Sequence, residues 1–115
     1  MKAQENLTAH SSQDPVLAEM VRRLVIEFHP HKIFLFGSRA MGTARQDSDY
    51  DFLIVMPELN GNARTLAVKA YDLLAGLGSA KDILFTSREH FEKRKTVANT
   101  MAEIATTDGI ELYAA

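Results

Sequence analysis

Two short blocks carry most of the information in this chain: Gly-Ser-Arg-Ala-Met-Gly at residues 37–42 and Ser-Asp-Tyr-Asp-Phe-Leu-Ile-Val at residues 48–55. Gly37 permits a sharp turn after an apolar run and lets a backbone approach a phosphate without a clash with a Cβ atom. Ser38 then lies where free N–H groups at the start of a helix favour an anion. The first block therefore indicates a loop that can hold phosphates.

Three aspartates add the features of a cation site. Asp49 and Asp51 are one residue apart at the start of an apolar strand, so they share one of its faces and can bind a cation between them. Asp51 and Asp82 each stand in apolar company, where an unpaired buried charge would be costly. An ion pair with Lys81 or Arg39 is the structural alternative. Three acids beside a phosphate loop suit two Mg²⁺ ions that bridge a nucleotide.

The composition restricts the class of protein. The 115 residues predict a loose arm over 1–13 and a single domain over 14–115. A net charge of −2 argues against a protein whose main task is to grip nucleic acid, and the absence of cysteine excludes disulfides and thiolate-bound zinc. No apolar run reaches the roughly 20 residues that span a bilayer, and the N-terminus lacks a signal pattern, so we expect a cytoplasmic protein.

The hydrophobic pattern predicts an α/β fold, with a small mixed β-sheet of three to four strands flanked by helices. A helix starts after Asp14, its N-cap, and stops at His29-Pro30. A tail at 110–113 can pair with a sheet edge of its own chain or of a neighbour. Strands are expected at 33–36, 49–56 and 81–85, a helical turn at 38–41, and further helices at about 63–77, 88–95 and 96–105.

These blocks, with the later Asp-Ile-Leu-Phe at 82–85, closely resemble the minimal nucleotidyltransferases of the DNA polymerase β superfamily. The pattern of that family is Gly-Ser-x-Ala-x-Gly, then Ser-Asp-x-Asp, then a third aspartate on a downstream strand. The resemblance covers roughly residues 33–85. It implies the nucleotidyltransferase fold and the Mg²⁺-dependent transfer of a nucleoside monophosphate, AMP from ATP, to a hydroxyl acceptor.

The resemblance also implies how the nucleotide is held. Ser38 would bind its phosphates with help from the backbone of Gly37, and Ser48 would belong to the same binding set. Arg39 matches a position that is often basic in the family and would contact phosphate, with a surface salt bridge as the alternative. Met41 replaces an arginine that is common in the family, so one phosphate contact is missing.

The catalytic and metal-binding roles fall to the aspartates. By the resemblance, Asp49 and Asp51 would ligate both Mg²⁺ ions. Asp82 would ligate the metal that activates the attacking hydroxyl and would act as its base. Tyr50, between the first two, should point to the opposite face and pack there.

The size of the chain bears on the acceptor. We expect the acceptor on another polypeptide, because 115 residues leave no room for an acceptor-binding domain. Relatives of this kind pair with a small helical HEPN protein, and the nucleotidyltransferase acts as an antitoxin that transfers AMP onto a tyrosine of this ribonuclease toxin. Two alternatives stay open: a small-molecule nucleotidyltransferase of the aminoglycoside-modifying type, and a non-catalytic antitoxin that acts by binding. A homodimer or a heterocomplex fits the small size, while direct binding to nucleic acid or to a membrane is not expected.

Overall fold

The computed structural model describes residues 14–45 and 48–115, so the arm predicted over 1–13 lies outside the described residues. The strands form one sheet in the order β3-β2-β1-β4. β2 and β3 are parallel, whereas β1 is antiparallel to both β2 and β4, so the prediction of a small mixed sheet is confirmed. The elements are α2 (Pro15–Phe28), β1 (Lys32–Phe36), α3 (Ser38–Met41), β2 (Tyr50–Met56), α4 (Ala63–Leu73), β3 (Lys81–Ser87), α5 (Arg88–Arg94), α6 (Met101–Asp108) and β4 (Ile110–Ala114).

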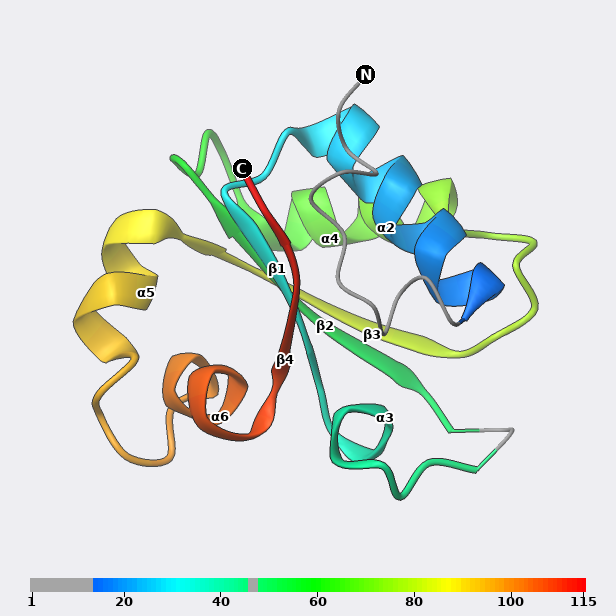
Figure 1. Cartoon of the computed structure of the whole chain (residues 1–115). Coiled ribbons are helices and arrows are strands. Elements are labelled where there is room, and N and C mark those ends of the chain that lie inside the picture. The colour runs from blue at the N-terminus through cyan, green and yellow to red at the C-terminus, as the bar shows by residue number, and fades with distance from the viewer. Residues whose placement is uncertain (1–13, 46–47) are drawn as a thin grey trace.

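Helices cover both faces of the sheet: α2 and α4 lie on one side, and α5 and α6 on the other (Figure 1). Successive side chains of β2 alternate between these two layers. Phe52 and Ile54 belong to the larger core beneath α2 and α4. Leu53 and Val55 belong to a smaller core beneath α5 and α6. The central strand is therefore apolar on both faces along most of its length, as its continuous hydrophobic run predicted.

The first helix begins and ends where the sequence predicts. Asp14 caps α2, and its Oδ1 accepts hydrogen bonds of 3.1 Å from the backbone N–H groups of Val16 and Leu17. Pro15 occupies the first helical position, where no N–H is needed. The helix ends at His29, whose φ of 50° is left-handed and whose N–H bonds to the carbonyl of Val25.

Two other helix predictions had wrong bounds, and the helix predicted to end at 105 extends to Asp108. The helix expected over 63–77 stops at Leu73, and Gly76 and Gly78 beyond it adopt positive φ angles of 88° and 79°. The helix expected over 96–105 begins only at Met101, because Thr100 caps it by accepting from the N–H of Glu103. None of the helices in residues 14–45 and 48–115 is long and apolar enough to cross a membrane.

The strand predictions need smaller corrections. β2 begins at Tyr50, so Asp49 immediately precedes the strand and is not part of it. β3 extends to Ser87, two residues beyond the predicted end. The tail predicted to pair with a sheet edge forms β4, which pairs antiparallel with β1 of the same chain.

Candidate active site

Asp51 and Asp82 lie opposite each other on the two parallel strands of the sheet. Asp51 of β2 is in register with Asp82 of β3, and the next two pairs along the strands are Phe52 with Ile83 and Leu53 with Leu84. The two aspartates therefore point to the face that carries α5 and α6. These helices pack on the smaller core farther along the strands, so the carboxylates stand at the uncovered end of this face.

The environment of Asp51 opposes its ionisation. Its side chain is half-buried, and burial is the largest cause that raises its pKa, followed by the negative charges of Asp82 and Asp49. Asp49 is exposed in the loop before β2. Among residues 14–45 and 48–115, no three His, Asp or Glu side chains converge as a finished metal site. Asp51 thus lies near two other carboxylates, whose negative charges disfavour its ionised form.

Asp82 differs from its sequence-based description. Asp82 was predicted to be an unpaired charge in apolar surroundings, and this prediction is wrong, because its side chain is exposed on the edge strand β3. The alternative of an ion pair with Lys81 also fails, since Lys81 Nζ donates instead to the carbonyl of Ser79 at 2.6 Å. The hydroxyl of Tyr71, on α4, accepts from the N–H of Ile83 at 2.9 Å and donates to Asp82 Oδ1 at 3.4 Å. Sequence reasoning missed Tyr71, because nothing in its local pattern connects it with a strand eleven residues away.

Gly37 brings the predicted phosphate loop against Asp51. Its φ of 76° and ψ of −158° fall in a region that essentially only glycine adopts. A Cβ atom at this position would collide with Asp51 Oδ2. Phe36, which precedes the turn, is paired with Asp51 across β1 and β2. The structure therefore places the backbone of this turn directly beside the carboxylate.

Ser38 begins α3, the short helical turn predicted over 38–41. The N–H groups of Ala40 and Met41 bond to the carbonyl of Gly37 at 3.1 and 3.2 Å, which fixes the turn. Ser38 is half-buried, and among the described residues its hydroxyl makes no hydrogen bond, so the group is available to a ligand. The helical turn closes at Gly42, which has a φ of 76°.

Arg39 and Ser48 organise the loop that leads to Asp49. The Nε and Nη2 atoms of Arg39 donate to the carbonyl of Ser48 at 3.0 and 2.8 Å. The hydroxyl of Ser48 accepts from the N–H of Arg45 at 2.8 Å. Through these bonds Arg39 and Ser48 stabilise the loop. Contact of either residue with phosphate stays a prediction.

Tyr50 anchors the same loop from the other face of the sheet. The guanidinium carbon of Arg39 lies 3.9 Å from the centre of the Tyr50 ring, and the Tyr50 hydroxyl donates to Asp14 Oδ2 at 2.7 Å. Burial, together with this bond, raises the pKa of Tyr50 to about 12. The prediction that Tyr50 packs away from Asp49 and Asp51 is confirmed, since its side chain belongs to the core under α2.

Both the sequence and the fold of this chain are similar to those of known proteins. Residues 17–106 match the family described as nucleotidyltransferase domain. The fold is similar to a crystal structure of a toxin–antitoxin with AMP-PNP, with a TM-score of 0.57 and 22% sequence identity, over 84% of this chain and 73% of that chain. No curated protein sequence matches significantly. Since the family match spans most of the chain, the resemblance found in the sequence is confirmed, and the protein belongs to the nucleotidyltransferase domain family.

Proposed function

We propose that this protein transfers AMP from ATP to a hydroxyl acceptor on a partner protein. The observation that carries the proposal is the meeting of three features at one end of the sheet. The turn at Gly37 leaves no room for a Cβ atom beside the Asp51 carboxylate, and Asp51 lies in register with Asp82. A turn that admits a phosphate beside a pair of carboxylates is the arrangement that phosphoryl transfer needs, because positioning and electrostatics supply most of its rate.

The donor set suits magnesium. Asp49, Asp51 and Asp82 offer only carboxylate oxygens, the ligands that Mg²⁺ prefers together with water and phosphate oxygens. Burial and the neighbouring charges raise the pKa of Asp51, so a bound cation would relieve an existing repulsion. When bound, two Mg²⁺ ions would neutralise the triphosphate and lower the pKa of the acceptor hydroxyl.

The proposed step is an in-line displacement at the α-phosphorus of ATP. The acceptor oxygen forms a bond to phosphorus as the bond to the β-phosphate oxygen breaks, and pyrophosphate leaves with the bonding electrons. Asp82, exposed on the edge strand, takes the proton of the acceptor hydroxyl. The hydroxyl of Ser38 and the backbone beside Gly37 hold the phosphates, with Arg39 and Ser48 completing the binding loop.

The proposed acceptor is a tyrosine of a HEPN-type helical toxin, which would make this chain an antitoxin of the cytoplasm. The family resemblance supports a separate acceptor protein. The similar crystal structure, a toxin–antitoxin with AMP-PNP, supports both a toxin partner and an adenine nucleotide. A homodimer within such a complex is compatible with the proposal.

Calorimetric titration of AMP-PNP with and without Mg²⁺ tests the nucleotide site. We expect wild-type protein to bind only with the metal, and Asp51→Asn to lose this binding. Asp72→Asn is the matched control, because Asp72 is an exposed acid on α4, which lies on the opposite face. Equal binding by wild type and Asp51→Asn would refute the assignment of Asp51.

Transfer of label from α-³²P-ATP tests the acceptor. The wild type and Asp82→Asn are each incubated with the purified product of the neighbouring gene, and the label is followed on protein and on small molecules. We expect labelled protein with the wild type and a loss of orders of magnitude with Asp82→Asn. Label on an added aminoglycoside alone would favour the small-molecule enzyme. Full neutralisation of a toxin by a triple variant at Asp49, Asp51 and Asp82 would favour the binding-only antitoxin.

A further inference from the structure

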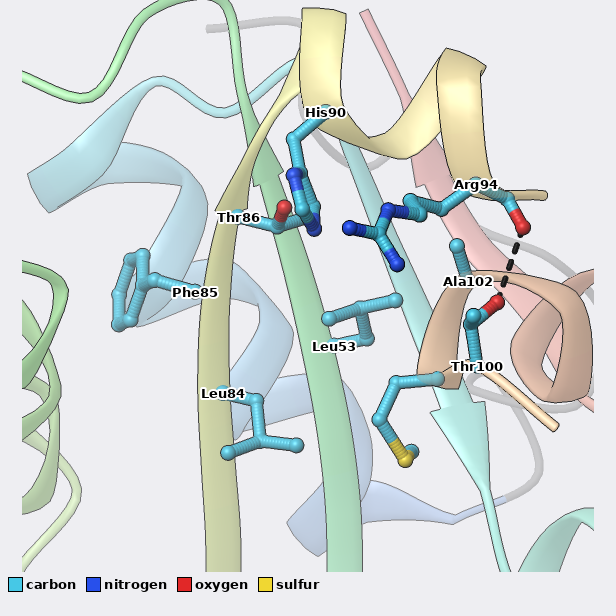
Figure 2. Close-up of a pocket in the computed structure, with 9 residues that line it drawn as sticks. Leu53, Leu84, Phe85, Thr86, His90, Arg94, Thr100 and Ala102 are labelled. Carbon is cyan, nitrogen blue, oxygen red and sulfur yellow. Dashed lines mark hydrogen bonds between the residues drawn. The ribbon is translucent and has the colours of Figure 1, made fainter. Parts of the chain in front are cut away.

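A cavity of about 280 Å³ lies on the same face of the sheet, beside the uncovered end that carries the two aspartates. α5 and α6 form its walls, and the strands β2 and β3 form its floor (Figure 2). The floor is apolar, with Leu53 and Leu84 in the strand positions that follow Asp51 and Asp82 on this face. Leu84 remains 38% exposed although it is a large apolar side chain. An apolar surface thus begins directly next to the carboxylates.

The rim of the cavity is polar and basic. Figure 2 shows the guanidinium of Arg94 and the imidazole of His90 pointing from α5 over the floor, with the hydroxyl of Thr86 beside the imidazole. Among the residues that the structure describes, no acidic side chain lines the cavity, and the side chain of Arg94 makes no ion pair or hydrogen bond. The adjacent Lys93, in contrast, pairs with Glu89 at 3.6 Å. Arg94 is an exposed residue whose guanidinium lies over the cavity, and no described side chain of opposite charge pairs with it.

The features of this face follow a fixed order along the strands. Asp82, Leu84 and Thr86 alternate on β3, and each step of two residues covers about 6.6 Å. Gly37 lies at the other end, against Asp51. The order is thus phosphate turn, carboxylates, apolar floor and polar rim. A nucleoside triphosphate presents its parts in the same order, with the phosphates first, then the reacting phosphorus, the ribose and the base.

We propose that this cavity is the subsite for the nucleobase of the nucleoside triphosphate. The proposal rests on the proposed function, because the phosphates must lie at Asp51 and Asp82 for the base to reach the cavity. The base would lie over Leu53 and Leu84, with the guanidinium of Arg94 stacked against its π-system. The volume lies just below the usual range of about 300–1,000 Å³ for ligand pockets, which suits one planar ring system.

The test compares a nucleotide with a probe that lacks the base. AMP-PNP and inorganic tripolyphosphate are titrated separately, each with Mg²⁺, into wild type, Arg94→Ala and Lys93→Ala. We expect Arg94→Ala to lower the affinity for AMP-PNP about tenfold, which corresponds to about 1.4 kcal/mol. The affinity for tripolyphosphate should not change. Lys93→Ala removes one positive charge from the same helix outside the cavity, so it should change neither affinity.

A second variant tests whether Thr86 forms a hydrogen bond with the edge of the nucleobase. Thr86→Val removes the hydroxyl at nearly constant shape and keeps a β-branched residue in β3, so folding should be preserved. We expect it to change the ratio of affinities for AMP-PNP and GMP-PNP, since these bases differ in their hydrogen-bonding edges. An unchanged affinity for AMP-PNP in Arg94→Ala overturns the proposal, and an unchanged ratio in Thr86→Val removes Thr86 from the subsite.

The remaining outcomes separate this proposal from the function on which it rests. If wild type binds neither probe, the nucleotide site itself is refuted, and the subsite with it. If wild type binds tripolyphosphate and loses it in Asp51→Asn, but Arg94→Ala retains full affinity for AMP-PNP, only the subsite is refuted. Equal weakening of both probes in Arg94→Ala would make Arg94 a phosphate ligand. If Arg94→Ala binds AMP-PNP as the wild type does but transfers less label to the partner protein, the cavity would be a binding site for the acceptor.

Discussion

The two faces of the sheet differ in how completely helices cover them. On the face of α2 and α4, the core is continuous and includes the side chains of Phe52 and Ile54, which are fully buried. On the face of α5 and α6, a smaller core ends at Leu53, and the strands then present Asp51 and Asp82. One strand thus serves two purposes, because its alternate side chains belong to different environments.

The difference indicates a division between stability and binding. The closed face removes most of the apolar surface from water and so contributes most of the stability of the fold. The open end holds like charges, of which Asp51 is half-buried; its ionisation opposes folding, but the group is suited to a cation. Substitutions on the two faces should therefore change different measured quantities, and four predictions test this, in order of decreasing effect.

Phe52→Ala should cause the largest loss of stability. The side chain is fully buried in the core beneath α2, and truncation of a buried phenylalanine costs about 3–5 kcal/mol. Leu84→Ala is the control on the open face and should cost under about 1 kcal/mol, because the side chain is partly exposed. Urea denaturation of both variants measures the free energy of unfolding. Similar losses of unfolding free energy in the two variants would contradict the inference that the closed face contributes most of the stability.

Gly37→Ala should lower both stability and nucleotide binding. Backbone strain at the φ of 76° costs about 1–3 kcal/mol, and the new Cβ atom would also displace the Asp51 carboxylate. Gly42→Ala has the same φ but open space around the new atom, so it should be strained without losing Mg²⁺-dependent binding of AMP-PNP. Thermal unfolding and calorimetry separate the two effects. If Gly37→Ala binds AMP-PNP with full affinity, the turn at Gly37 is not part of the nucleotide site.

Tyr50→Phe should reduce stability by about 1 kcal/mol and leave nucleotide binding unchanged. It removes the bond to Asp14 on the closed face, and such bonds contribute about 0.5–1.5 kcal/mol. The pKa of Tyr50 is about 12 in the folded protein and near 10 when unfolded, so its contribution is present below pH 10 and is lost as the pH rises towards 12. Unfolding of wild type and variant between pH 8 and 12 should show their difference shrinking. A difference that stays constant would mean that the hydroxyl does not titrate as described.

Asp51→Asn should have the smallest effect on stability, and in the opposite direction. The pKa of Asp51 is raised by burial, so its ionisation opposes folding, and the penalty appears as the pH rises above the unfolded value of 3.8. Removal of the charge should therefore increase stability at pH 7 by about 0.5 kcal/mol, the lower end of typical gains from surface-charge changes. The gain in Tm should disappear at low pH and when Mg²⁺ with AMP-PNP protects the wild type. A loss of stability at pH 7 would show that the carboxylate has a structural partner.

Several parts of the fold could be predicted because their signals are local. Asp14 and Pro15 define the start of α2 through one hydrogen-bonding side chain and one restricted backbone angle, and both act within a single turn. The apolar run of β1 and the aspartate spacing before β2 likewise need no distant partner to be recognised. The start of α6 was missed because the capping threonine competes with an equally helical pattern upstream.

The sequence by itself determined the residue types of the candidate site, which are a glycine in a turn that other residues adopt only with strain, a serine after it, and aspartates at or beside strands. Their pattern matches that of the nucleotidyltransferase family, to which the chain belongs. Only the tertiary structure decided which residues meet. The parallel register brings Asp82 beside Asp51, Tyr71 reaches the edge strand, and Arg94 and His90 come to lie over the same face as the carboxylates. The physical reason is that local patterns encode residue type and element, whereas strand order and register are set by packing of the whole core.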